Sequence, residues 1–192
     1  MRYGCPPTEG ERDVPILNKR ALLMSTPARL DAAIDRLRRS RIFTRQFLAD
    51  LTADEWFWSP PEYATHVAWQ VGHLAVAQYN LCLRRIRGRT AEDETLISDR
   101  FIDAFKLGSN PLAGAKHNLP LEEIQRVFDA VHHQALTELP LVDNAELDTP
   151  VEQPHPVFKT KLGAIDWSSQ HELVHAGQIA MLRRLMGKAP LR

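Results

Sequence analysis

The sequence predicts an all-α protein, a four-helix bundle, and two observations carry this prediction. Four segments of roughly twenty residues each place apolar residues at three- and four-residue steps, which is the spacing of a helix with one buried face. No segment alternates apolar and polar residues as a half-buried strand does. Helices of this kind bury their apolar stripes against one another in a bundle.

The first predicted helix covers about residues 26–51. Its apolar seam continues to the end of the segment and consists of Leu30, Ile34, Leu37, Thr44, Leu48 and Leu51. Thr52 and Glu55 then have the spacing of a capping box, which begins a short helical turn. Pro60 and Pro61 end this turn, because proline cannot continue a helix.

Three further helices follow, over about 64–87, 120–139 and 162–186. Gly88 and Gly187 come directly after the second and the fourth of them, where glycine often ends a helix. Each of the three segments carries one apolar stripe, so all four helices have a face to bury.

The predicted organisation is a partly ordered N-terminal leader, residues 1–25, followed by one bundle domain, residues 26–192. Two long connections, about 88–119 and 140–158, have room to cross over the bundle, so that neighbouring helices need not all be antiparallel. A short helix is predicted within the first connection, over about 96–105.

Composition excludes several classes of function. The chain has 192 residues with 24 basic and 24 acidic side chains, so no global positive charge attracts nucleic acid. Cys5 and Cys82 lie far apart, which disfavours a disulfide framework and favours a cytoplasmic location. The N-terminus lacks the apolar core of a signal peptide, and charges interrupt apolar runs short of a membrane span.

His171 and His175 are the most informative residues of the chain. Side chains four residues apart lie one above the other on a helix, within reach of one metal ion. Their stripe also holds Gln178, Leu182 and Leu185, which indicates a buried pair. Two buried imidazoles without a metal or other partners would leave polar atoms unsatisfied.

A catalytic metal site needs a third protein ligand from another helix. His73 fits best, with Trp69 one turn before it and the small Ala77 one turn after it. His132, on the flank of the third helix's apolar face, is the alternative third ligand and would serve as a fourth in a structural site. Surface positions are predicted for the remaining histidines, His66, His117, His133 and His155.

The run from His171 to His175 also matches the HExxH pattern of zinc peptidases, in which Glu172 would be the general base. The chain lacks a third ligand downstream of His175, and it lacks the strand that frames a peptide substrate. A peptidase is therefore disfavoured.

Two motifs resemble those of the DinB/YfiT-like superfamily, which is distinct from the similarly named DNA polymerase. Residues 69–75, WQVGHLA, resemble that family's W-x-x-GHLA element. Residues 171–187, which begin HELVHAGQI and end RRLMG, resemble its HExxHxGQI…RxxG ending. The prelude 51–61 is also similar, and the resemblance covers about residues 26–187.

The resemblance implies an up-down-down-up bundle and one divalent ion held by His73, His171 and His175. Characterised members of this family include S-transferases that use bacillithiol or mycothiol, a mycothiol-dependent maleylpyruvate isomerase and an iron-binding domain of ergothioneine synthesis. Several members are dimers, which implies a homodimer here.

The leading hypothesis is a metal-dependent enzyme that transfers a low-molecular-weight thiol to a small electrophile. There are two alternatives: a metal-dependent hydrolase, and a non-catalytic metal- or ligand-binding bundle related to stress response. Three imidazoles suit Zn, Ni or Fe. Glu172 is predicted as a base or as a support for the ligands, and Gln178 as a residue that orients a bound molecule. An open metal position would favour catalysis, and a fourth protein ligand would favour a structural ion.

Overall fold

A computed structural model describes residues 26–61, 65–112 and 114–191. The predicted leader, residues 1–25, lies outside these ranges. Within them the chain is helical, and the one β-type pairing is an isolated bridge between Pro150 and Thr160. No helix in the described ranges has the length and apolar character that crossing a membrane requires.

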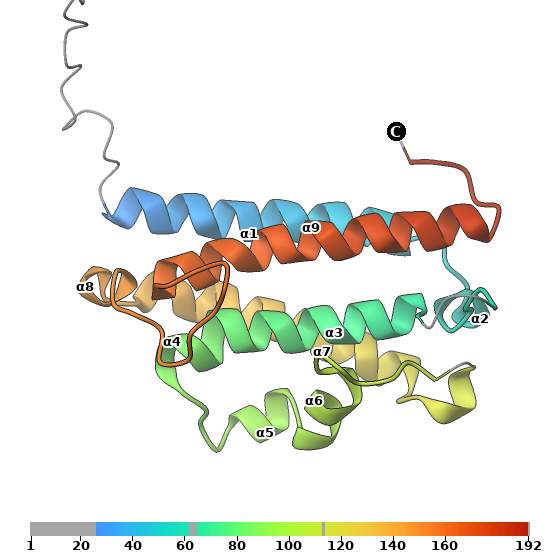
Figure 1. Ribbon diagram of the computed structural model, residues 1–192, viewed down its shortest axis with the longest axis horizontal. Helices are drawn as coiled ribbons and strands as arrows, with labels where there is room; N and C mark the ends of the chain where they lie inside the picture. Colours follow the sequence, from blue (N-terminus) through green and yellow to red (C-terminus); the bar gives the residue numbers. More distant parts are fainter. Residues whose placement is uncertain (1–25, 62–64, 113, 192) are drawn as a thin grey trace, which may run out of the picture.

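Four long helical segments form the bundle, as the sequence predicts. They are α1 (Thr26–Leu48), α3 (Val67–Tyr79) with its continuation through the π-helical turn η1 (Asn80–Arg84) and α4 (Arg85–Arg87), α7 (Leu121–Glu138) and α9 (Lys161–Leu185). Figure 1 shows α1 and α9 running in one direction and α3 and α7 in the other. The predicted up-down-down-up order is therefore confirmed.

Short helices occupy the connections. They are α2 (Ala53–Trp56), α5 (Asp93–Leu96), α6 (Asp99–Phe105), η2 (Ala115–His117), η3 (Leu139–Leu141) and α8 (Asn144–Leu147). The short helix predicted near 96–105 corresponds to α6, with α5 directly before it. Figure 1 shows α6 beside α3, and the two helices are in contact. Part of the first long connection therefore covers one side of α3, the central helix of the bundle.

Local capping agrees with the sequence pattern. Thr52 and Glu55 form the predicted capping box of α2, each bonding to the backbone of the other. Gly88 and Gly187 follow α4 and α9 with φ of 84° and 83°, a conformation that glycine adopts without a Cβ penalty.

The bundle packs α1 against α9, and α3 against both α7 and α9. α3 is apolar on most of its circumference, and only Trp69 and Ala77 are not fully buried. Trp69 and Ala77 lie one turn on either side of His73, so the least covered strip of the central helix runs past this histidine.

Candidate metal centre

His73 projects from the middle of α3 with a fixed ring orientation. Its Nδ1 lies 2.8 Å from the carbonyl oxygen of Phe105 in α6. A carbonyl only accepts hydrogen bonds, so Nδ1 carries the proton and donates it. The indole ring of Trp69 stacks on the imidazole of His73, with ring centroids 4.9 Å apart and an interplanar angle of 6°. Nε2 of His73 is therefore the free, unprotonated nitrogen.

Gly72 permits the close approach of α6 that this hydrogen bond needs. A Cβ at Gly72 would lie 2.5 Å from the Phe105 ring, closer than atoms can pack. The missing side chain brings the backbone of Phe105 against α3, next to His73. The glycine of the GHLA motif thus helps to place the donor ring that follows it.

The other two candidate ligands lie on α9. Nε2 of His171 and Nε2 of His175 are 3.2 Å apart. Nδ1 of His175 donates to Oε1 of Gln70 in α3. Gln70 is itself oriented, because its Nε2 donates to Oγ1 of Thr65 at 2.8 Å. This chain of bonds leaves Nε2 of His175 unprotonated and directed at the other two histidines.

His73, His171 and His175 form one cluster in which the ligand nitrogens all lie within 4.8 Å of one another. Two nitrogens bound tetrahedrally to zinc are about 3.3 Å apart, close to the spacing within the α9 pair. Bare nitrogens at this separation repel unless a proton or cation lies between them. Within the described residues the cluster holds three such ligands and no fourth. The donor set therefore fits a divalent ion with one open position.

Burial keeps these imidazoles neutral, which is the form that binds metal. It lowers the pKa of His73, and it lowers that of His171 to about 4, with smaller contributions from His73 and His155. Burial, followed by the neighbouring His171 and His73, lowers the pKa of His175 to about 3. Near neutral pH all three rings are therefore available as ligands.

The structure places Gln178 and Glu172 differently with respect to the cluster. Gln178 is exposed and forms a hydrogen bond with His175. This bond raises the pKa of His175, but burial lowers that pKa by more. Glu172 is only 2% exposed, and its Oε1 accepts from Nε of Arg41 at 2.8 Å. The observed partners of Glu172 thus lie in the core, and its predicted action as a base stays a prediction.

Arg41 is the centre of a buried polar network that the sequence analysis missed. Besides Glu172, it donates to the carbonyl of Phe128 at 2.7 Å and to Oε1 of Gln78 at 2.9 Å. Its guanidinium also lies over the Phe128 ring, 3.4 Å from the centroid. Gln78 continues the network to Nδ1 of His132 at 3.1 Å. His132, considered as a third or fourth ligand, belongs to this network and lies outside the metal cluster.

One surface prediction is wrong. His66 is buried and caps the N-terminus of α3, where its Nδ1 accepts from the backbone N–H of Trp69 at 3.1 Å. Its Nε2 donates to the carbonyl of Leu112 at 3.1 Å. His117 and His133 are exposed as predicted, and His155 is half-buried in the connection before α9.

Fold and site together define a class of protein, a four-helix bundle in which two helices bring three histidines into one candidate metal site. The particular family follows from the sequence. A family model described as the DinB superfamily matches residues 25–179, and the chain belongs to this superfamily. The predicted resemblance is thereby confirmed. No curated protein matches the chain.

Proposed function

We propose that this protein is a divalent-metal-dependent enzyme that transfers a low-molecular-weight thiol to a small electrophile. One observation carries the proposal: hydrogen bonds to Phe105 and Gln70 leave Nε2 of His73 and of His175 free in a cluster with three protein ligands. Three ligands with an open position are typical of catalytic sites, whereas structural sites normally have four.

The charge of the site supports thiol chemistry. Three neutral imidazoles would leave the double charge of a divalent ion held there uncompensated, and the chemistry that such an ion would supply is stabilisation of a thiolate. His73, His171 and His175 would hold the ion, and zinc, nickel and iron all suit this donor set. Burial of the three rings limits access by water and strengthens the interaction between the ion and an anionic sulfur.

The described part of the chain offers no reactive thiol of its own, which supports a small-molecule thiol as the donor. Burial raises the pKa of Cys82, the one cysteine in the described part of the chain, to about 12. A fully protonated, buried thiol is not a nucleophile. A free cysteine also agrees with the reducing cytoplasm expected from the sequence.

Two half-buried tryptophans flank the cluster and offer apolar surface to a small substrate. Trp69 stacks on His73, and its indole N–H donates to Oγ of Ser109 at 3.0 Å, which fixes the ring. The ring of Trp167, one turn before His171, lies 6.2 Å from that imidazole. We infer that the electrophile is a small organic molecule that contacts these rings.

The decisive experiment measures metal content and thiol consumption together. The purified wild-type protein and His73→Ala are compared by elemental analysis, and both are then screened with several thiols and a model electrophile. His133→Ala, which removes an exposed histidine of α7, is the matched control. We expect His73→Ala alone to lose the metal and the thiol consumption. Thiol consumption that survives His73→Ala would reject the transferase, and metal bound without turnover would favour a non-catalytic bundle.

We also propose that two copies of the chain associate through the outer face of α9. Large apolar side chains there are about half exposed, namely Leu173, Val174, Met181 and Leu185. Light scattering after gel filtration tests this proposal. Met181→Glu is expected to halve the mass of a wild-type dimer, and a monomeric wild-type protein would exclude the association.

A further inference from the structure

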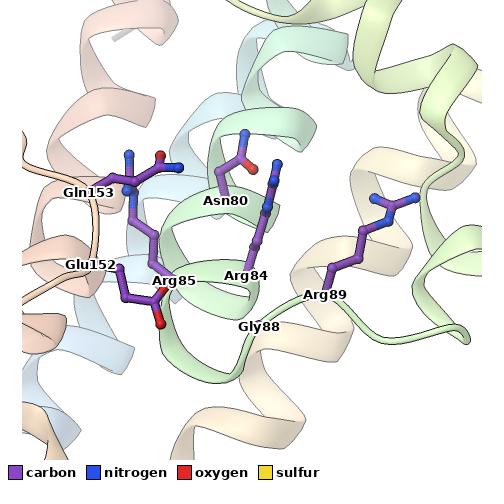
Figure 2. A pocket seen from close by; sticks show the side chains of 7 residues that line it. All are labelled: Asn80, Arg84, Arg85, Gly88, Arg89, Glu152 and Gln153. Carbon is purple, nitrogen blue, oxygen red and sulfur yellow. The ribbon is translucent and has the colours of Figure 1, made fainter.

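A polar cavity of about 370 Å³ lies at the end of the central helix, apart from the histidine cluster. It is lined by Asn80, Arg84, Arg85, Gly88 and Arg89, and by Glu152 and Gln153 of the connection before α9. Figure 2 shows the head groups of Asn80, Arg84, Arg85 and Gln153 on one side of the turn, while the Glu152 carboxylate points away from them.

The π-helical turn η1 brings two consecutive arginines to this cavity. In an α-helix, with 3.6 residues per turn, Arg85 would stand about 140° away from Asn80. Here the backbone N–H of Arg85 bonds to the carbonyl of Asn80, five residues before it. The wider turn therefore places Arg85 above Asn80, with Arg84 beside it. Such turns are frequent at functional sites.

The two arginines of this turn differ from their neighbours in having no carboxylate partner. Arg87 is paired with Asp93 and Glu138, and Arg89 with Glu94 and Asp99. Among the described residues no carboxylate pairs with Arg84 or Arg85, and Nε of Arg85 is buried without a hydrogen-bond partner.

The guanidinium of Arg85 lies near an aromatic ring instead of a carboxylate. It lies 5.7 Å from the ring centroid of Phe158, on the connection before α9. Burial, and next the charge of Arg84, lower its pKa. Two cations are thus kept close together with one of them partly desolvated, an arrangement that a bound anion would stabilise.

We propose that this cavity binds the carboxylate or phosphate group of a small molecule. A guanidinium group can bind two oxygens of a carboxylate or of a phosphate at once with its paired N–H donors. The amides of Asn80 and Gln153 supply neutral donors, and Gly88 presents no side chain to the cavity. The cavity lies apart from the histidine cluster: Asn80 lies seven residues after His73, about 10 Å further along the helix axis.

Titrations followed by NMR test the proposal, with inorganic phosphate and succinate as separate probes at low ionic strength. We expect at least one probe to bind the wild-type protein and to bind about tenfold more weakly to Arg84→Gln and to Arg85→Gln. Arg126→Gln, which removes an exposed arginine of α7, is the matched control and should retain wild-type affinity. The probe that binds identifies the class of anion.

A further variant separates binding from folding. Arg85→Lys keeps the charge and most of the aliphatic stem but loses the paired donors of the guanidinium, so it should fold normally and still bind more weakly. His73→Ala should bind the anion as the wild type does, which keeps this result separate from that of the metal experiment. Failure of both probes to bind, binding that survives both glutamine substitutions, or equal loss in Arg126→Gln would overturn the proposal.

Discussion

The carbonyl oxygen of Phe105 accepts a hydrogen bond from Nδ1 of His73 at 2.8 Å. The acceptor lies at the end of α6, a seven-residue helix in a connection, and the donor lies on the central helix of the bundle. The first long connection thus takes part in the candidate site, because it sets the protonation and orientation of one of the three imidazoles.

Gly72→Ala is expected to damage this arrangement. The new Cβ would lie 2.5 Å from the Phe105 ring, so α6 has to move and the bond to His73 is lost or stretched. We expect a loss of about 1–3 kcal/mol in the free energy of unfolding, measured with urea, together with weaker metal binding. Gly177→Ala, at a helical glycine with no atom within 4 Å, is the control and should stabilise by up to about 1 kcal/mol. Equal effects of the two substitutions would contradict the packing argument.

Gln70→Ala is expected to weaken metal binding without removing a ligand. It leaves the Nδ1–H of His175 without its acceptor and frees the ring to rotate. Removal of such a supporting partner typically costs about 10–100-fold in metal affinity. Competition with a chromophoric chelator measures the affinity, and Gln125→Ala on the exposed side of α7 serves as control. An unchanged affinity would show that Gln70 does not orient the ligand.

Breaking the buried pair of Arg41 and Glu172 should be costly. Both side chains are only 2% exposed, so Glu172→Gln leaves an uncompensated buried charge and is expected to destabilise by about 3–5 kcal/mol. The double variant Arg41→Met/Glu172→Leu should recover much of that loss. Arg39→Met, which breaks an exposed pair with Asp35, should change stability by about 1 kcal/mol or less. Denaturant unfolding of each variant measures these changes.

The same variant tests the predicted catalytic action of Glu172. If Glu172→Gln remained stable while losing thiol consumption, the residue would act as a base. A stability loss with normal activity per folded molecule would assign it to the core network.

The free energy of unfolding should decrease as the pH falls, partly because of His132. Burial, and next the charge of Arg41, lower its folded pKa to about 3, whereas an unfolded histidine titrates near about 6.5. Between these values the unfolded chain binds the extra proton, so the free energy of unfolding decreases as pH falls, by at most about 1.4 kcal/mol per pH unit. Above about pH 6.5 both forms are neutral and the effect vanishes.

The measurement compares urea unfolding of the wild type and His132→Gln between about pH 4.5 and 7.5. The wild type should lose stability more steeply below about pH 6.5. Parallel curves would show that His132 titrates alike in the folded and unfolded chain.

Much of the fold could be predicted from the sequence, because helix periodicity and caps are local signals. The four long helices lie within a few residues of their predicted bounds, and the Thr52–Glu55 capping box and the terminal glycines Gly88 and Gly187 are all present. The spacing of His171 and His175 predicts a shared helix face for the same local reason, and His73 joined them through its place on a second buried stripe.

The burial of Arg41 could not be predicted from local sequence patterns. The predicted seam of the first helix has a gap between Leu37 and Thr44, and Arg41 fills it at helical spacing. That gap is the signal in the sequence that Arg41 could be buried. A buried arginine is tolerated only where an acidic partner lies next to it, and its partner Glu172 is 131 residues away in the chain.

The amino-acid sequence by itself determined the helices, their caps, the family and the two histidine-bearing faces, since each depends on residues within a few turns of one another. Only the tertiary structure decided which ring nitrogens face the cluster, through Phe105 and Gln70, and that His66 is buried. Those outcomes depend on hydrogen bonds between separate elements, and the direction and depth of such contacts are set by how the helices pack together.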